Sequence, residues 1–188
     1  PQINSSGNIT SVNIESGALE WQISTHNSDD LNEIISLKTS NLIIDENKIF
    51  FSNNKNVFYS LDLNTGNINW KQNISSSVKP AVIGDLLFTI SDNGYLFLID
   101  KNRGNIVRIN DIFKNFKPKV KKNLVPTGFI LDTNNLYVST NFGKLLIVNI
   151  ENASTKEILK IGKGKLSRPF VKNQNLFLIK DNAIIKLN

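Results

Sequence analysis

The sequence predicts an all-β fold built from one repeated hairpin, and three observations support this prediction. Short apolar runs rich in β-branched and aromatic residues alternate with Asn, Asp and Gly turns, which is typical of strands joined by hairpins. One hairpin pattern recurs, with copies that begin at residues 7, 56, 94, 143 and 182, in steps of 49, 38, 49 and 39. No stretch keeps the apolar spacing of a helix.

The clearest copy of the hairpin is Asn56–Trp70. Its apolar run, Val57 to Leu63, leads into the turn Asn64-Thr65-Gly66, and a second short run ends on Trp70. Glycine at the end of such a turn adopts a positive φ at little steric cost, so two antiparallel strands are joined tightly. A repeat of about 40 to 50 residues suits four short strands and their turns, which is the size of one β-propeller blade.

The other four copies keep this pattern to different degrees. They are Gly7–Trp21, Gly94–Arg108, Gly143–Ile158 and Asn182–Asn188, the last of which is cut short by the end of the chain. Trp21 and Trp70 occupy the same repeat position, whereas Arg108 stands there in the third copy. Because the position recurs with the repeat, we expect the two tryptophans to pack blades together rather than to hold a cofactor.

Two further apolar runs precede each later hairpin and complete a blade. These pairs of runs are 41–45 with 48–52, 80–83 with 86–91, 127–131 with 136–140, and 169–172 with 176–180. We therefore predict a β-propeller segment of about four four-stranded antiparallel blades, half of an eight-bladed ring, with incomplete first and last blades. The blades are expected near residues 1–21 (partial), 41–72, 79–109, 127–160 and 168–188 (partial), and the first is expected to have only its last two strands.

Composition excludes several chemistries. The chain has no cysteine, so disulfides, thiolate metal sites and cysteine nucleophiles are ruled out. The single histidine, His26, stands among Ser24, Ser28 and Asp29. A polar loop does not hold such groups in the relay that a catalytic triad needs, and one histidine is not a metal-ligand set. We therefore predict no catalytic, metal or cofactor-binding residues.

The chain also has no methionine and opens inside an expected blade, so we expect a truncated N-terminus and a natural C-terminus.

The chain is basic, with a net charge of +6 and a pI near 9.5. Basic chains often bind nucleic acid or anionic membranes, but here the lysines are scattered, and the richness in Asn, Ile and Lys together favours an AT-rich coding bias. No nucleic-acid partner is expected. Only Asp111–Leu124 is dense in charge, with Lys114, Lys117, Lys119, Lys121 and Lys122 around Phe113 and Phe116. This segment is either a basic-aromatic contact loop or a solvated loop pinned by two phenylalanines, and we favour the second interpretation.

Two insertions indicate which face of the blades binds a partner. Gln22–Ser40 and Asp111–Pro126 lengthen two links between blades, on the same face as the turns at Ser52–Lys55, Asp92–Gly94 and Phe142–Gly143. Insertions on a rigid repeat often mark a binding face. The first insertion carries apolar residues close together, which are Leu31, Ile34, Ile35 and Leu37. Such residues dock a partner or fold back under the blade, and the two alternatives are equally weighted. Asp92 and Asn93 are further candidates on this face.

The repeat resembles the quinoprotein-type propeller repeat, in which an aspartate ends the third strand, a glycine makes the turn and a tryptophan follows four residues later. Asp62, Gly66 and Trp70 keep this pattern. Quinone-dependent dehydrogenases that share the repeat carry a vicinal cysteine pair over the cofactor. This chain has no cysteine, which disfavours the quinone-dependent branch, and no cofactor is predicted.

In more detail, the chain is similar to the C-terminal half of the BamB family, lipoproteins of the bacterial outer-membrane β-barrel assembly machinery. The likeness covers the insertion before Asn41–Ile44 and the closing segments Arg168–Val171 and Asp181–Leu187. It implies a non-catalytic periplasmic scaffold, associated with the outer membrane, that docks the barrel-inserting subunit through the loop corresponding to Leu31–Leu37. Glu33 falls where the family has an arginine. The family's lipid anchor, its only membrane contact, lies outside this chain.

Two other functions and one further partner stay open at this stage. The chain could instead be a fragment of a pyrroloquinoline-quinone-dependent dehydrogenase, or a stand-alone ligand-binding propeller. Because the missing strands of the first and last blades are expected to be complementary, either one chain closes on itself or two chains pair into an eight-bladed ring. We favour the second arrangement, a homodimer.

Overall fold

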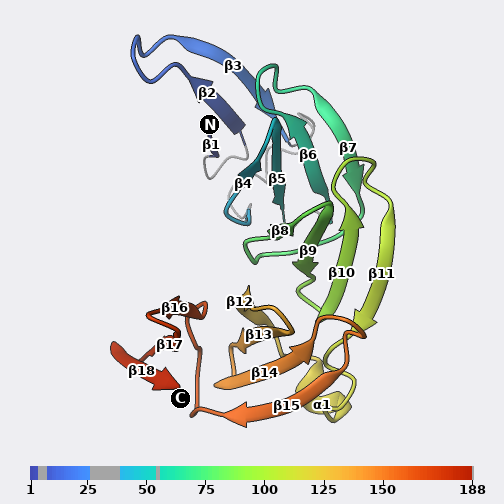
Figure 1. Cartoon of the computed structure of the whole chain (residues 1–188), viewed down its shortest axis with the longest axis vertical. Coiled ribbons are helices and arrows are strands. Elements are labelled where there is room, and N and C mark those ends of the chain that lie inside the picture. The colour runs from blue at the N-terminus through green and yellow to red at the C-terminus, as the bar shows by residue number, and fades with distance from the viewer. Residues whose placement is uncertain (4–7, 26–38, 54–55, 188) are drawn as a thin grey trace.

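The computed structural model describes residues 1–3, 8–25, 39–53 and 56–187. They form five antiparallel sheets that follow one another along an open arc (Figure 1). We number the sheets as blades 1 to 5 in chain order. In the four-stranded blades the first strand lies toward the inside of the arc and the last strand at its outer edge (Figure 1).

The strands are short, and each blade is an up-and-down meander. Blade 1 holds β1 (Gln2–Ile3), β2 (Asn8–Val12) and β3 (Leu19–Ser24); blade 2 holds β4 (Ile43–Asp45), β5 (Lys48–Ser52), β6 (Phe58–Asp62) and β7 (Ile68–Gln72); blade 3 holds β8 (Ala81–Ile83), β9 (Leu86–Ile90), β10 (Tyr95–Asp100) and β11 (Ile106–Asp111); blade 4 holds β12 (Pro126–Leu131), β13 (Asn135–Thr140), β14 (Lys144–Asn149) and β15 (Thr155–Lys160); blade 5 holds β16 (Phe170–Lys172), β17 (Asn175–Lys180) and β18 (Ala183–Leu187). One short helix, α1 (Pro118–Lys121), lies in the link between blades 3 and 4.

The predicted all-β propeller fold with incomplete terminal blades is confirmed. The expectation that blade 1 has only two strands is wrong, because Gln2 and Ile3 pair with Thr10 and Ile9 and add a third strand. Blades 1 and 5 therefore hold six strands together, more than the four of one blade. The terminal blades of two copies therefore do not supply exactly each other's missing strands, as the expected eight-bladed ring would require.

Each apolar core lies between two neighbouring blades. In β5, Ile49 and Phe51 pack toward blade 1, whereas Phe50 packs toward blade 3. This follows from the strand period of two, which sends successive side chains to opposite faces of a sheet. The second and third strands of blades 2 to 4 are therefore rich in apolar residues on both faces.

The hairpin turns are held by a carboxylate or amide at the end of the third strand. In blade 2, Oδ1 of Asp62 accepts hydrogen bonds from the backbone N–H groups of Asn64, at 2.9 Å, and Thr65, at 2.8 Å. This is the local bonding that makes Asp and Asn favourable in turns. Gly66 then takes a φ of +73° and closes the hairpin.

A tryptophan from the outer strand of one blade locks onto the hairpin turn of the next blade. The indole N–H of Trp21 donates to the backbone oxygen of Leu63, and that of Trp70 donates to Lys101, both at 3.0 Å. A Cβ atom on Gly66 would lie 2.6 Å from the Trp21 ring. Glycine is thus required at the turn both for its φ and for the space that the indole fills, and the predicted blade-packing role of the tryptophans is confirmed.

The third copy keeps this contact with different residues. The guanidinium of Arg108 in β11 donates to the backbone oxygen of Glu151, in the hairpin turn of blade 4. Ala153 replaces the turn glycine there and keeps a positive φ of 55°. The contact between an outer strand and the next turn therefore survives the loss of both tryptophan and glycine.

We predict that Trp70→Ala lowers the free energy of unfolding by about 3 kcal/mol, the lower end of the range for such truncations, because the indole is only half-buried. The ring stacks on Phe58 and packs against Phe50. Trp70→Phe should cost about 1 kcal/mol, since it loses mainly the hydrogen bond to Lys101. Urea denaturation measures both variants. Equal stability of Trp70→Ala and the unchanged chain would show that the contact between Trp70 and the next hairpin turn does not stabilise the fold.

Candidate functional site

The blades have two chemically different ends. In an up-and-down blade, the turn between the second and third strands lies at the same end as the link to the next blade. We call this end the link face; it carries the turns at 91–94 and 141–143 and the links at 73–80, 112–125 and 161–169. The opposite end, which we call the turn face, carries the other two turns of each blade.

On the link face, Asp92 fastens the link between blades 2 and 3. Its carboxylate accepts hydrogen bonds from the Ser75 hydroxyl at 2.9 Å, and from the N–H and hydroxyl of Ser77 at 2.9 and 2.6 Å. The backbone N–H of Asp92 donates to the oxygen of Ser75 at 3.0 Å. The predicted partner-binding residue Asp92 therefore has its acceptor oxygens used inside the protein.

A network of buried hydroxyl groups joins the link between blades 2 and 3 to strands β5 and β9. The Ser52 hydroxyl donates to the oxygen of Ile74 at 3.0 Å and accepts from the N–H of Ser76 at 3.1 Å. The Ser76 hydroxyl donates to Ile90 and accepts from Thr89. Because buried polar groups are costly unless they are bonded, this network fixes the position of the link.

The basic loop is anchored by Phe113, which is fully buried. Its ring lies directly beneath Gly94, where an added Cβ atom would be 2.0 Å from the ring. Phe116 packs edge-on against Phe113, with ring centres 5.8 Å apart. The pinning of this segment by two phenylalanines is confirmed, and the contact interpretation of its lysines stays open.

A groove of about 430 Å³ lies between the turn at 91–94 and helix α1. Its lining residues are Asn93, Tyr95, Pro118, Lys121 and Lys122. Lys121 forms an ion pair with Asp111, and its ammonium lies 5.7 Å from the centre of the Tyr95 ring. The hydrogen bond to Asp111 raises the pKa of Lys121. The structure thus brings Asn93 and the basic loop, which the sequence presents separately, into one groove.

The other predicted contact residues cannot be placed in this way. Leu31, Glu33, Ile34, Ile35 and Leu37 lie outside the described residues, so their role stays a prediction. On the described link face, sequence reasoning missed Tyr95 in the groove and Phe142, whose side chain is 42% exposed at the turn of blade 4. Phe142 stands in the turn between the second and third strands, and that position is the signal that identifies it.

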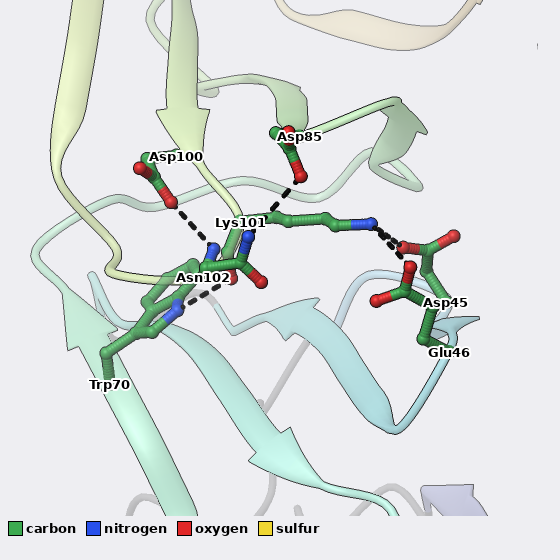
Figure 2. A network of polar contacts seen from close by, with 7 residues as sticks. All are labelled: Asp45, Glu46, Trp70, Asp85, Asp100, Lys101 and Asn102. Carbon is green, nitrogen blue, oxygen red and sulfur yellow. Dashed lines mark hydrogen bonds and ion pairs between the residues drawn. The ribbon is translucent and has the colours of Figure 1, made fainter.

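The turn face uses its charges internally, as Figure 2 shows for blades 2 and 3. The Lys101 ammonium lies 2.7 Å from a carboxylate oxygen of Asp45 and 3.5 Å from one of Glu46, which tie blade 3 to blade 2. The hydrogen bond to Asp45 raises the pKa of Lys101. The backbone oxygen of the same lysine is the acceptor of Trp70. This network is structural.

Among the described residues, no group of three or more His, Cys, Asp and Glu side chains is arranged to hold a metal ion. His26 and its polar neighbours Ser28 and Asp29 lie outside that part of the chain. None of the described helices has the length and apolar character that a membrane crossing requires.

The fold, together with the hairpin turns that a tryptophan of the preceding blade covers, defines a β-propeller built from quinoprotein-type repeats. The family model described as outer membrane protein assembly factor BamB matches residues 3–110, more than half of the chain. The chain therefore belongs to this family.

Individual relatives agree with the family match. An outer membrane protein assembly factor BamB of Legionella pneumophila (strain Paris) is 26% identical over 108 residues, which covers 56% of this chain and 26% of that protein. An uncharacterized protein of Rickettsia prowazekii (strain Madrid E) is 25% identical over 194 residues, covering 95% of this chain. The chain spans 46% of that relative's length.

A solved structure supports the fold. The crystal structure of BamB from Moraxella catarrhalis superimposes with a TM-score of 0.59 and 17% identity, covering 98% of this chain and 67% of that one.

We predict that acid destabilises the fold through its turn aspartates. Hydrogen bonds from the Thr65 and Arg103 backbones hold the pKa values of Asp62 and Asp100 below their ordinary range. A lowered folded-state pKa stabilises the fold above the unfolded pKa, near 4, and this contribution is lost as pH falls through the folded value. The free energy of unfolding should therefore stay level from about pH 7 to 5 and fall below about pH 4.

The control is Asp62→Asn combined with Asp100→Asn, because Asn13 and Asn149 make the same turns without charge. This variant should lose less stability on acidification in urea titrations at several pH values. Parallel curves for the variant and the unchanged chain would contradict the assignment.

Proposed function

We propose that this chain is part of a non-catalytic periplasmic scaffold, associated with the outer membrane, that docks the barrel-inserting subunit of the β-barrel assembly machinery. The observation that carries the proposal is the family match over residues 3–110. One relative with a functional name, from Legionella pneumophila, is an outer membrane protein assembly factor BamB. No cofactor is part of this proposal.

The ends of the first insertion support a docking role for the link face. Before the insertion, the hydroxyl of Tyr59 donates to the backbone oxygen of Thr25 at 3.2 Å. After it, the N–H of Ser40 donates to the oxygen of Ser52 at 2.8 Å, and Thr39 pairs with Asn53. Both ends of the insertion are thus fixed to blade 2 near its link-face end. A loop on such a rigid base is well placed to present contact residues to a partner.

A homodimer is a second proposed partner arrangement. Blade 5 exposes an apolar side away from blade 4, where Phe170 and Phe177 stack at 5.5 Å beside Ile184 and line a groove of about 430 Å³. Equivalent sides of the other described blades are covered by the next sheet. Light scattering after gel filtration should give twice the 21.1 kDa chain mass, and Phe177→Ser should restore the monomer. A monomeric unchanged chain would refute this arrangement.

The docking prediction concerns the insertion. Interface energy concentrates in a few central apolar anchors, so Ile34→Ala, Ile35→Ala and Leu37→Ala should each weaken binding of the barrel-inserting subunit by about 1–2 kcal/mol. Changes in an exposed loop leave the free energy of unfolding within about 0.5 kcal/mol. Pull-down and thermal melting measure the two effects.

Ile14→Ala is the matched control, because Ile14 is 98% exposed in a turn of the opposite face and should leave binding unchanged. A melting temperature that falls by several degrees while binding persists would show that the three insertion residues are core residues instead.

A further inference from the structure

Charge is divided between the two faces of the described arc. The turn face carries most of the acids, which are Glu15, Asp45, Glu46, Asp62, Asp85, Asp100, Asp132 and Glu151. The links at 112–125 and 161–169 on the link face carry basic residues, which are Lys114, Lys117, Lys119, Lys121, Lys122, Lys163, Lys165 and Arg168. The link face of blades 3 and 4 is therefore cationic.

Apart from Lys121, the lysines of the loop at 112–125 have no ion-pair partner within the described residues. Four exposed lysines, which we call the lysine patch, are Lys114, Lys117, Lys119 and Lys122. The ion pairs found in the described chain involve Lys101, Lys121 and Lys180, and none involves the patch. Two acids on this face are already bonded within the protein. Asp111 pairs with Lys121, and Asp92 accepts hydrogen bonds from the serines of the link between blades 2 and 3.

The patch stands on a rigid base rather than on a free loop. Phe113 anchors one end beneath Gly94. At the other end, Asn141 donates through its side-chain amide to the oxygen of Asn123 and accepts from the N–H of Val125, both at 2.9 Å. A preorganised surface loses little conformational entropy when it binds.

We propose that the groove and the lysine patch dock an acidic, extended segment of a partner protein. Patch lysines attract its carboxylates, while the amide of Asn93 and the half-exposed ring of Tyr95 line a groove that accepts a peptide backbone and an apolar side chain. The groove favours a polypeptide over a bilayer surface, because the Asn93 amide both donates and accepts hydrogen bonds and so matches a peptide group. Complementary charge raises the association rate and selects the partner.

This inference goes beyond the proposed function, since it assigns a partner contact to the loop at 112–125 without the insertion at 26–38, and the two surfaces share Asn93. Its test therefore needs no assembly-machinery subunit. The probe is a fluorescein-labelled peptide of alternating glutamate and alanine with one central tyrosine, measured by fluorescence anisotropy. The unchanged chain should bind it, and added salt should weaken binding, because ions screen exposed charges over about 8 Å at physiological ionic strength.

The variant Lys114→Glu/Lys117→Glu/Lys119→Glu/Lys122→Glu should raise the Kd by at least about ten-fold, as expected for reversal of complementary charge. The corresponding Lys→Gln variant should give a smaller rise and excludes repulsion as the sole cause. The matched control, Arg103→Glu/Lys156→Glu/Lys172→Glu/Lys186→Glu, makes the same net change on exposed residues outside the link face and should stay within about two-fold at physiological salt.

Three results would overturn the proposal. The first is failure of the unchanged chain to bind the peptide. The second is an equal loss in the patch variant and the matched control, which would reduce the effect to net charge. The third is patch-dependent binding to phosphatidylglycerol vesicles without binding to the peptide, which would assign the surface to a membrane. Circular dichroism confirms that each variant folds.

Discussion

The structure depends on one contact, in which an outer-strand side chain of one blade closes over the hairpin turn of the next. Trp21 and Trp70 make it by filling the space that Gly66 and Gly104 leave and by bonding to the turn backbone. Neighbouring sheets also meet through apolar side chains, which are not directional, and through polar contacts such as the ion pair of Lys101 with Asp45. The indole N–H adds direction and sets the register of one blade on the next. Arg108 preserves this directional bond where the tryptophan is lost.

This contact accounts for part of the difference between the two faces. The turns that receive the tryptophans need Asp or Asn at the end of the third strand to bond their N–H groups, and this requirement places Asp62 and Asp100 on the turn face. Those acids are then occupied by turn backbones, and Asp45 is occupied by Lys101 of the neighbouring blade. The link face has no such requirement, so its loops vary in length and charge, and we propose that partners contact it.

Much of the fold could be predicted from the sequence, because strand alternation and recurrent Gly and Trp positions are local signals. The strand β1 could not, since its two residues are too short to form a visible apolar run. Pro118 marks the start of α1, but four residues carry no helical period. The placement of Asn93 beside Lys122 depends on Phe113 packing beneath Gly94, a contact between blade and link that no pattern shows. The insertion residues Ile34 and Ile35 stay a prediction.

We propose that the link face makes the contacts with the assembly machinery. Hydrogen–deuterium exchange of the chain, alone and with the periplasmic domains of the barrel-inserting subunit, tests it most directly, because amide protection reports burial along the whole backbone. If the link face makes these contacts, amide exchange in the presence of the periplasmic domains should be slower in the insertion at 26–38 and in the turn at 91–94. Exchange in the turns at 62–67 and 100–105 should be unchanged. Protection confined to those turn-face segments, or none at all, would contradict the proposal.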